Sequence, residues 1–273
     1  MHTGWIEVAA IPAVLLGFYA LNSKHWFSDH ARLAWAWIKS WARLAPFTTV
    51  LWLLVAVHAW MLIGLPPRLR NAVLAVHSTN LAQLRRDPVT VLFASAMWTD
   101  ASELIFLTGM SLLILGPLER WLGTKRTVAA FLAGHIGATL LIALWLASAL
   151  TAHSQQDQLL SHTIDVGVSY GTYCCAALLA YRLRLPYRLL AWGLFGGWLF
   201  YHAATVDFDA TVDFTALGHL LAFSIGLLLY PLTRSKMARN RRDTPWIMVR
   251  PINVIAVTPP AAVPTNETRP VPR

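Results

Sequence analysis

Six stretches of this chain are apolar over close to the ~20 residues that a helix needs to cross a bilayer. They cover residues 46–65, 102–118, 127–150, 166–181, 187–205 and 214–232. Apolar residues make up 56 % of the chain and charged residues only 13 %, whereas an average soluble domain has roughly 25 % charged residues. The pattern and the composition together predict an all-α, polytopic membrane protein.

The stretches divide the chain into three parts. Residues 1–45 are hydrophobic and amphipathic with a basic stretch, residues 46–232 hold the six spans, and residues 233–273 form a basic, proline-rich tail that we expect to be disordered. Within the first part, 5–21 is apolar apart from Glu7. It fits a seventh span, an interfacial helix or an extended start, but it lacks the basic region and cleavage site of a signal peptide.

Basic residues alternate between the connections. They occur before the first span, near 119–126, near 182–188 and in the tail, whereas the loops near 151–165 and 206–213 contain no Lys or Arg. The positive-inside rule then places the basic segments and the C-terminal tail in the cytoplasm of a multi-pass plasma-membrane protein. The connection 66–101 carries four Arg on the predicted outer side. Because half of it is apolar, we expect it to lie partly buried along the outer leaflet.

A serine and a histidine lie at nearly the same predicted depth in two of the spans. Ser169 follows Asp165 by four residues, and His219 follows Asp213 by six. At a helical rise of ~1.5 Å per residue, both side chains lie roughly 6–9 Å below the same surface. Polar groups are costly inside a bilayer and are therefore functional candidates. Such a pair is suited to act as nucleophile and base.

The residues around this pair resemble the rhomboid superfamily of intramembrane serine proteases, and the similarity covers roughly 46–232. The segment Gly167-Val168-Ser169 is similar to the family's Gly-x-Ser motif. Tyr173 matches the aromatic residue that packs against the catalytic histidine, and its spacing places it on the same helix face as Ser169. The block from Asp165 to Gly171 is most similar to a divergent bacterial branch of rhomboid-like proteins.

Small residues on the sixth span extend the resemblance. Gly218, Ala222 and Gly226 let two helices approach closely in lipid, as the family's base-carrying helix does, and we group Gly171 of the fourth span with them. The stretch 116–123 is similar to the family's Gly-x-x-x-Glu-x-x-x-Gly turn after the second span. Its half from Glu119 fits, whereas Gly116 lies one residue too close to Glu119.

The resemblance implies a six-helix rhomboid-like bundle that cleaves transmembrane protein substrates. Ser169 would attack the scissile carbonyl, and His219 would act as general base and then as general acid. Tyr173 would orient the imidazole, and the Gly167–Ser169 segment would contribute to the oxyanion site through the Ser169 N–H. The expected partners are transmembrane proteins and the lipid bilayer, with the oligomeric state left open.

Three further positions depart from the family pattern. A histidine and an asparagine of the second span normally help to stabilise the oxyanion, but counting back from Glu119 puts Glu103 and Leu107 there. Thr108 is a substitute donor, as is a protonated Glu103. The glycine that normally follows the serine is here Tyr170. Because losing one oxyanion donor costs about 10²–10³ in rate, the alternative is a catalytically inactive rhomboid-like protein that binds transmembrane clients.

Other functions fit the sequence less well. His135, between Gly134 and Gly137, predicts an interhelical hydrogen bond rather than catalysis. The histidines lack metal-ligand spacing, so we expect no zinc site, and we also expect no cofactor and no nucleic-acid partner. A small transporter would place its polar site at the midplane, whereas the serine and histidine here lie near one surface.

Overall fold

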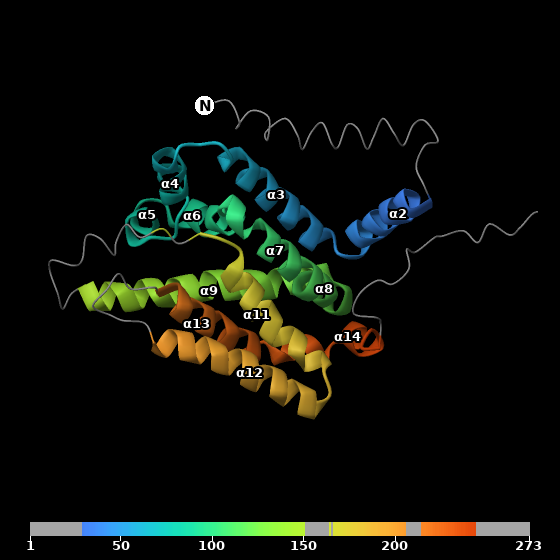
Figure 1. Cartoon of the computed structure of the whole chain (residues 1–273). Helices are drawn as coiled ribbons and strands as arrows, with labels where there is room; N and C mark the ends of the chain where they lie inside the picture. The colour runs from blue at the N-terminus through green and yellow to red at the C-terminus, as the bar shows by residue number, and fades with distance from the viewer. Residues whose placement is uncertain (1–28, 151–163, 165, 206–213, 244–273) are drawn as a thin grey trace, which may run out of the picture.

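The computed structural model describes residues 29–150, 164, 166–205 and 214–243. The candidate span 5–21 and most of the tail lie outside this range. Over the described residues the chain forms helices and short turns, with no strand among them (Figure 1). The prediction of an all-α membrane protein is therefore confirmed.

Each predicted span has a helical counterpart. The first span corresponds to α3 (Pro46–Leu62), and the second to a continuous run of η2 (Ala101–Glu103), α7 (Leu104–Met110), η3 (Ser111–Leu115) and α8 (Gly116–Leu122). The third corresponds to α9 (Thr124–Leu150), and the fourth to α11 (Ser169–Leu179) with η4 (Ala180–Arg182). The fifth corresponds to α12 (Leu185–Ala204), and the sixth to α13 (Phe214–Leu228) with η5 (Tyr230–Arg234). Within the described residues, three runs are long and apolar enough to cross a membrane, namely Ala101–Leu122, Thr124–Ser148 and Phe214–Arg234. A fourth would be α2 (Asp29–Leu44) with α3, two helices that meet at a bend of 109°.

A buried carboxylate from α8 fixes the start of α3. Glu119 accepts hydrogen bonds from the backbone N–H groups of Phe47 and Thr48, both at 2.9 Å, and from the hydroxyls of Thr48 and Thr124. The first N–H groups of a helix have no partner within the helix, and a carboxylate complements the positive end of the helix dipole. Glu119, only 1 % exposed, therefore joins the first two spans.

α3 presents apolar residues on both of its faces. Its buried face carries Thr48, Leu51, Val55, Ala59 and Leu62 at helical spacing. Its other face exposes Val50, Leu53, Val57 and Met61. An exposed apolar face of this kind suits a helix whose surroundings are lipid.

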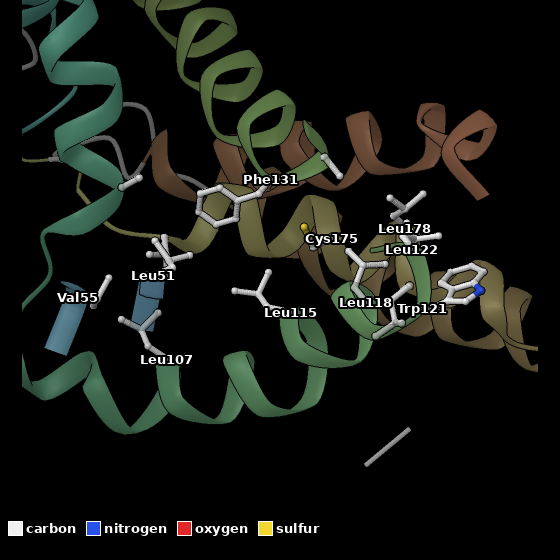
Figure 2. Packing of buried hydrophobic residues seen from close by; sticks show 14 of the residues in the cluster. Leu51, Val55, Leu107, Leu115, Leu118, Trp121, Leu122, Phe131, Cys175 and Leu178 are labelled. Atoms are coloured by element: carbon white, nitrogen blue, oxygen red, sulfur yellow. The ribbon is translucent and has the colours of Figure 1, made fainter. Parts of the chain in front are cut away.

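Side chains from four helices meet in the largest core. Leu51 of α3, Leu107 of α7, Phe131 of α9 and Leu178 of α11 all belong to it, and Leu115 of η3 lies between them (Figure 2). Each of these side chains is buried. This core holds the first two spans against the third and fourth.

Small residues bring α9, α11 and α13 into close contact. A Cβ on Gly134 would collide with Cys174, and a Cβ on Gly226 would collide with the backbone carbonyl of Cys174 from the opposite side. A Cβ on Gly171 would collide with the ring of Phe131. Cys174 and Cys175 are both buried free cysteines that form no disulfide. α11 thus packs closely against both α9 and α13.

Three basic connections meet at one end of the bundle. Trp121 Nε1 at the end of α8 donates to the carbonyl of Ala238 in α14 (Lys236–Asn240) at 2.8 Å. Arg241 donates to the Arg120 carbonyl at 3.2 Å, and Arg182 donates to the Arg242 carbonyl at 3.0 Å. These contacts place the connections after the second and fourth spans and the start of the tail on the same side.

The long first connection folds into a lobe of short helices. These are α4 (Pro67–Val76), α5 (Leu81–Arg86), α6 (Pro88–Ala94) and the turn η1 (Ser95–Met97). Trp98 stacks between His58 of α3 and His77 at the end of α4, with ring centroids 4.4 and 4.3 Å away. Arg70 of α4 pairs with Asp100 at 3.2 Å. The stack and the ion pair fasten the lobe to α3 and to the start of η2.

Candidate functional site

The serine of the predicted motif is the first residue of α11. Gly167 has φ +123°, a conformation that L side chains rarely adopt, and its N–H donates to the carbonyl of Ser95 in η1 at 2.7 Å. Residues 166–168 are therefore not helical, and the predicted start of the fourth span at 166 is wrong by three residues. Asp165 lies outside the described residues. The turn leaves the backbone N–H of Ser169 at the helix N-terminus, where no intrahelical acceptor exists.

A cavity of about 410 Å³ brings the two predicted catalytic residues together. Ser169 reaches it from the start of α11 and His219 from the second turn of α13. Tyr173, Gly167 and Glu103 also line this cavity. Five of the residues singled out from the sequence thus surround one space, and both Ser169 and His219 are only partly buried.

Two tyrosines of α11 hold the imidazole of His219. The ring of Tyr173 lies 4.3 Å from it, tilted by 33°. The ring of Tyr170 lies 5.4 Å away and meets it edge-on at 78°. Contacts from two sides restrict the rotation of the imidazole, which is what a base needs in order to stay aligned with its nucleophile.

Tyr170 was missed as a site residue. The sequence indicates only that it replaces the glycine that follows the serine in the family pattern. It is 2 % exposed, and its phenol lies where a side chain on Gly218 would be, since a Cβ there would collide with the ring and the hydroxyl. The sequence does contain a signal for this contact. A large residue follows the serine on one span, and a glycine precedes the histidine on the other.

The substitute donor Thr108 is not brought to the cavity. Its hydroxyl donates to the carbonyl of Leu104 at 2.8 Å and accepts from Trp52 Nε1 at 2.9 Å. A hydroxyl has one proton to donate, so that proton is already used. Leu107, one residue earlier, lines the cavity but has no donor.

Two carboxylates line the cavity opposite the helix start. Asp100 accepts from the backbone N–H of Ser102 at 3.0 Å and from its hydroxyl at 2.9 Å. The Ser102 backbone bond, then its hydroxyl and the Arg70 charge, lower the pKa of Asp100 below its ordinary value against the opposing effect of burial. Glu103 is exposed and lines the same cavity as Tyr173.

A second serine and histidine form a buried pair elsewhere. Nε2 of His135 lies 3.1 Å from Ser95 Oγ and 3.1 Å from the carbonyl oxygen of Leu92. A carbonyl oxygen can only accept, so a hydrogen bond there puts the proton on Nε2. A protonated Nε2 has no lone pair with which to take the proton of Ser95. Ser95 and His135 are also almost fully buried and lie outside the lining of the cavity.

Three of the four predicted packing residues lie along one stripe of α13, and the fourth, Gly171, lies on α11. Gly218 faces Tyr170, and Gly226 faces Cys174 and Ala177. Ala222, between them, is completely buried. Close packing along this stripe sets the separation of the helices that carry Ser169 and His219.

The described part of the chain contains no group of three or more His, Cys, Asp or Glu side chains arranged to hold a metal ion. The polar side chains that line the cavity are three aliphatic hydroxyls, one phenol, one imidazole and two carboxylates, from Thr99, Ser169, Thr215, Tyr173, His219, Asp100 and Glu103.

One of three comparisons with known proteins gave a match to this chain. Neither the curated proteins nor the solved structures gave a match to the chain. A family model described as rhomboid-like protein matches residues 40–239. This range starts within α2 and ends within α14, so it includes the cavity, the lobe and every helical run of the bundle. The chain is an integral membrane protein that belongs to the rhomboid-like protein family.

Proposed function

We propose that this protein is an intramembrane serine protease in which Ser169 and His219 cleave transmembrane substrates. The observation that carries the proposal is the shared cavity of Ser169, His219 and Tyr173. His219 takes the Ser169 proton as the hydroxyl oxygen attacks the scissile carbonyl, and then returns a proton to the leaving amine. Water hydrolyses the acyl-enzyme in the reverse sequence, which restores the free serine.

The backbone at the start of α11 stabilises the oxyanion in this proposal. It takes the place of the histidine and asparagine side chains that the family has on the second span and that this chain lacks. Ser169 is the first helical residue, so its N–H and the positive end of the helix dipole face the cavity. Preorganised backbone donors are well suited to a developing oxyanion. The proposed mechanism therefore relies on Ser169 N–H rather than on Thr108.

A second function is the binding of transmembrane clients without cleavage. The observation that favours it is Glu103, because an anionic carboxylate in the cavity disfavours an oxyanion nearby. The tyrosines around His219 weigh against it, since a binding protein has no requirement for an oriented base.

For orientation, we propose that the end formed by α8, η4 and α14 faces the cytoplasm of a plasma membrane. Arg120, Arg182 and Arg241 lie at this end, in accord with the positive-inside rule. The cavity then opens toward the outer side. Reporter fusions after residue 243 and after residue 150 test this, and a cytoplasmic signal from the second fusion would contradict it.

The deciding experiment is fluorophosphonate labelling of the full chain in lipid bilayers. We expect wild type to be labelled and Ser169→Ala and His219→Ala to lose labelling. The matched control is Ser95→Ala, which removes the serine of the other pair and should stay labelled. Equal background labelling in all four proteins would overturn the protease proposal and favour client binding.

A further inference from the structure

The cavity beside Ser169 has an apolar wall and a carboxylate at one end of it. Phe106 and Leu107 form part of that wall, and they follow Glu103 by three and four residues. At this spacing the three side chains lie on the same face of the helical run Ala101–Leu122. The surface therefore changes from apolar to anionic over one helical turn.

The charge of the cavity is negative and not fully compensated. No Lys or Arg is among its lining residues in the part of the chain that the structure describes. Asp100 is engaged by Arg70 and by the two hydrogen bonds from Ser102. For Glu103, no ion pair is found among the described residues, and its side chain is exposed. Glu103 is thus the carboxylate that is available to a ligand.

We propose that this cavity receives a basic side chain, Lys or Arg, from the end of a transmembrane substrate or client, and that Glu103 selects it. Lys and Arg have long apolar stems that lie along hydrophobic surface while the charged group reaches a polar environment. Here the stem would lie along Phe106 and Leu107, and the cation would meet Glu103. A Gln side chain of similar length fits the wall but gains no charge interaction.

The same contact has a consequence for catalysis, which rests on the proposed protease function. An anionic Glu103 repels the negative charge that develops on the scissile carbonyl oxygen. A substrate cation bound at Glu103 offsets this repulsion during the reaction. The basic residue would then raise the rate of cleavage as well as the affinity.

The experiment measures binding, so that it does not depend on turnover. The full chain with Ser169→Ala is placed in lipid nanodiscs and titrated with fluorescent synthetic peptides of about 20 apolar residues. The peptides carry Lys, Gln or Glu at each of the outermost few positions and are otherwise identical. We expect the best Lys peptide to bind up to about five-fold more tightly than its Gln twin, which is the upper end for one exposed ion pair.

Variants at residue 103 identify the selecting group. Glu103→Gln on the Ser169→Ala background should remove the Lys preference, and Glu103→Lys should prefer the Glu peptide. The control Asp243→Asn removes an exposed carboxylate beside α14 and should leave the preference unchanged. Equal binding of Lys and Gln peptides at every position, or a Lys preference that persists in Glu103→Gln, would overturn the proposal.

Labelling and binding separate the two proposals. Fluorophosphonate labelling of Ser169 without a Lys preference would support the protease and refute the selection by Glu103. A Lys preference that depends on Glu103 in a protein that is never labelled would refute the protease and leave a client-binding protein with the same selectivity.

Discussion

The phenol of Tyr170 occupies the space beside Gly218 in which a side chain would otherwise lie. The same ring meets His219 edge-on, with the centroids 5.4 Å apart. A tyrosine in place of the family's glycine is therefore matched by a glycine on the facing helix. The two residues together set how closely α11 and α13 approach at the level of the site.

This match predicts that Gly218→Ala is costly. The added methyl would displace the buried ring of Tyr170 or push α13 away, and overpacking of this kind costs about 1–3 kcal/mol. We expect a lower midpoint when unfolding in mixed micelles is followed by circular dichroism. The control is Gly197→Ala in α12, where a Cβ meets nothing within 4 Å. An equal loss of stability in both variants would argue against the close approach.

A second prediction concerns the buried cap of α3. Glu119→Gln replaces one acceptor oxygen by an amide nitrogen, which then faces either the donors of Phe47 and Thr124 or the two donors of Thr48. Leaving buried donors unsatisfied should lower the free energy of unfolding by about 2–4 kcal/mol. Thr124→Val removes one donor only and should cost less. If Glu119→Gln unfolds like wild type, the carboxylate does not fix the helix start.

A third prediction tests the role of Tyr173. Tyr173→Phe keeps the ring that lies 4.3 Å from His219 and should label with fluorophosphonate at close to the wild-type rate. Tyr173→Ala frees the imidazole, and misplacement of a catalytic group can cost up to about 10²-fold. If Tyr173→Phe labels normally and Tyr173→Ala does not, the ring of residue 173 positions His219 and its hydroxyl takes no part in the chemistry. Slow labelling of the Phe variant would assign the function to the hydroxyl instead.

A fourth prediction concerns the pKa of Asp100. Ser102→Ala removes the hydroxyl bond, so the pKa of Asp100 should rise toward its ordinary value of 3.8, and Arg70→Gln should raise it less. Carbon-13 NMR titration of the labelled carboxyl measures both shifts. A larger shift in Arg70→Gln would mean that the ion pair dominates.

The lowered pKa of Asp100 also determines how the stability of the lobe depends on pH. A carboxyl whose pKa is lower in the folded state contributes stability above its unfolded pKa, and this contribution is lost as pH falls through the folded pKa. The Asp100 contacts that fasten the lobe should therefore persist down to pH values below 3.8 in wild type. In Ser102→Ala they should weaken at a higher pH, as limited proteolysis of the lobe would report.

Hydrophobicity predicted where the helices lie but not how each one starts. The apolar runs located α9 and α13 well because those helices are long and uninterrupted. The start of α11 was misplaced because the positive φ of Gly167 is set by a contact with Ser95, more than seventy positions earlier. Contacts over such separations leave no local pattern.

Sequence spacing along the second span is also a poor guide to which helix face a residue occupies. η3, residues Ser111–Leu115, is π-helical, and a π-helical turn holds more residues than an α-helical turn. A count back from Glu119 to Glu103 passes through it, so the helical face reached is not the one that an ideal helix gives. The cavity nevertheless contains Glu103 and Leu107.

The contact of Trp121 with Ala238 joins two residues 117 positions apart. A nascent chain that enters the membrane in sequence has made α8 long before α14 emerges. The indole of Trp121 must therefore wait for its acceptor until nearly the whole bundle has been synthesised. This end of the molecule therefore closes only after the last span has been made, and not with the insertion of the second span.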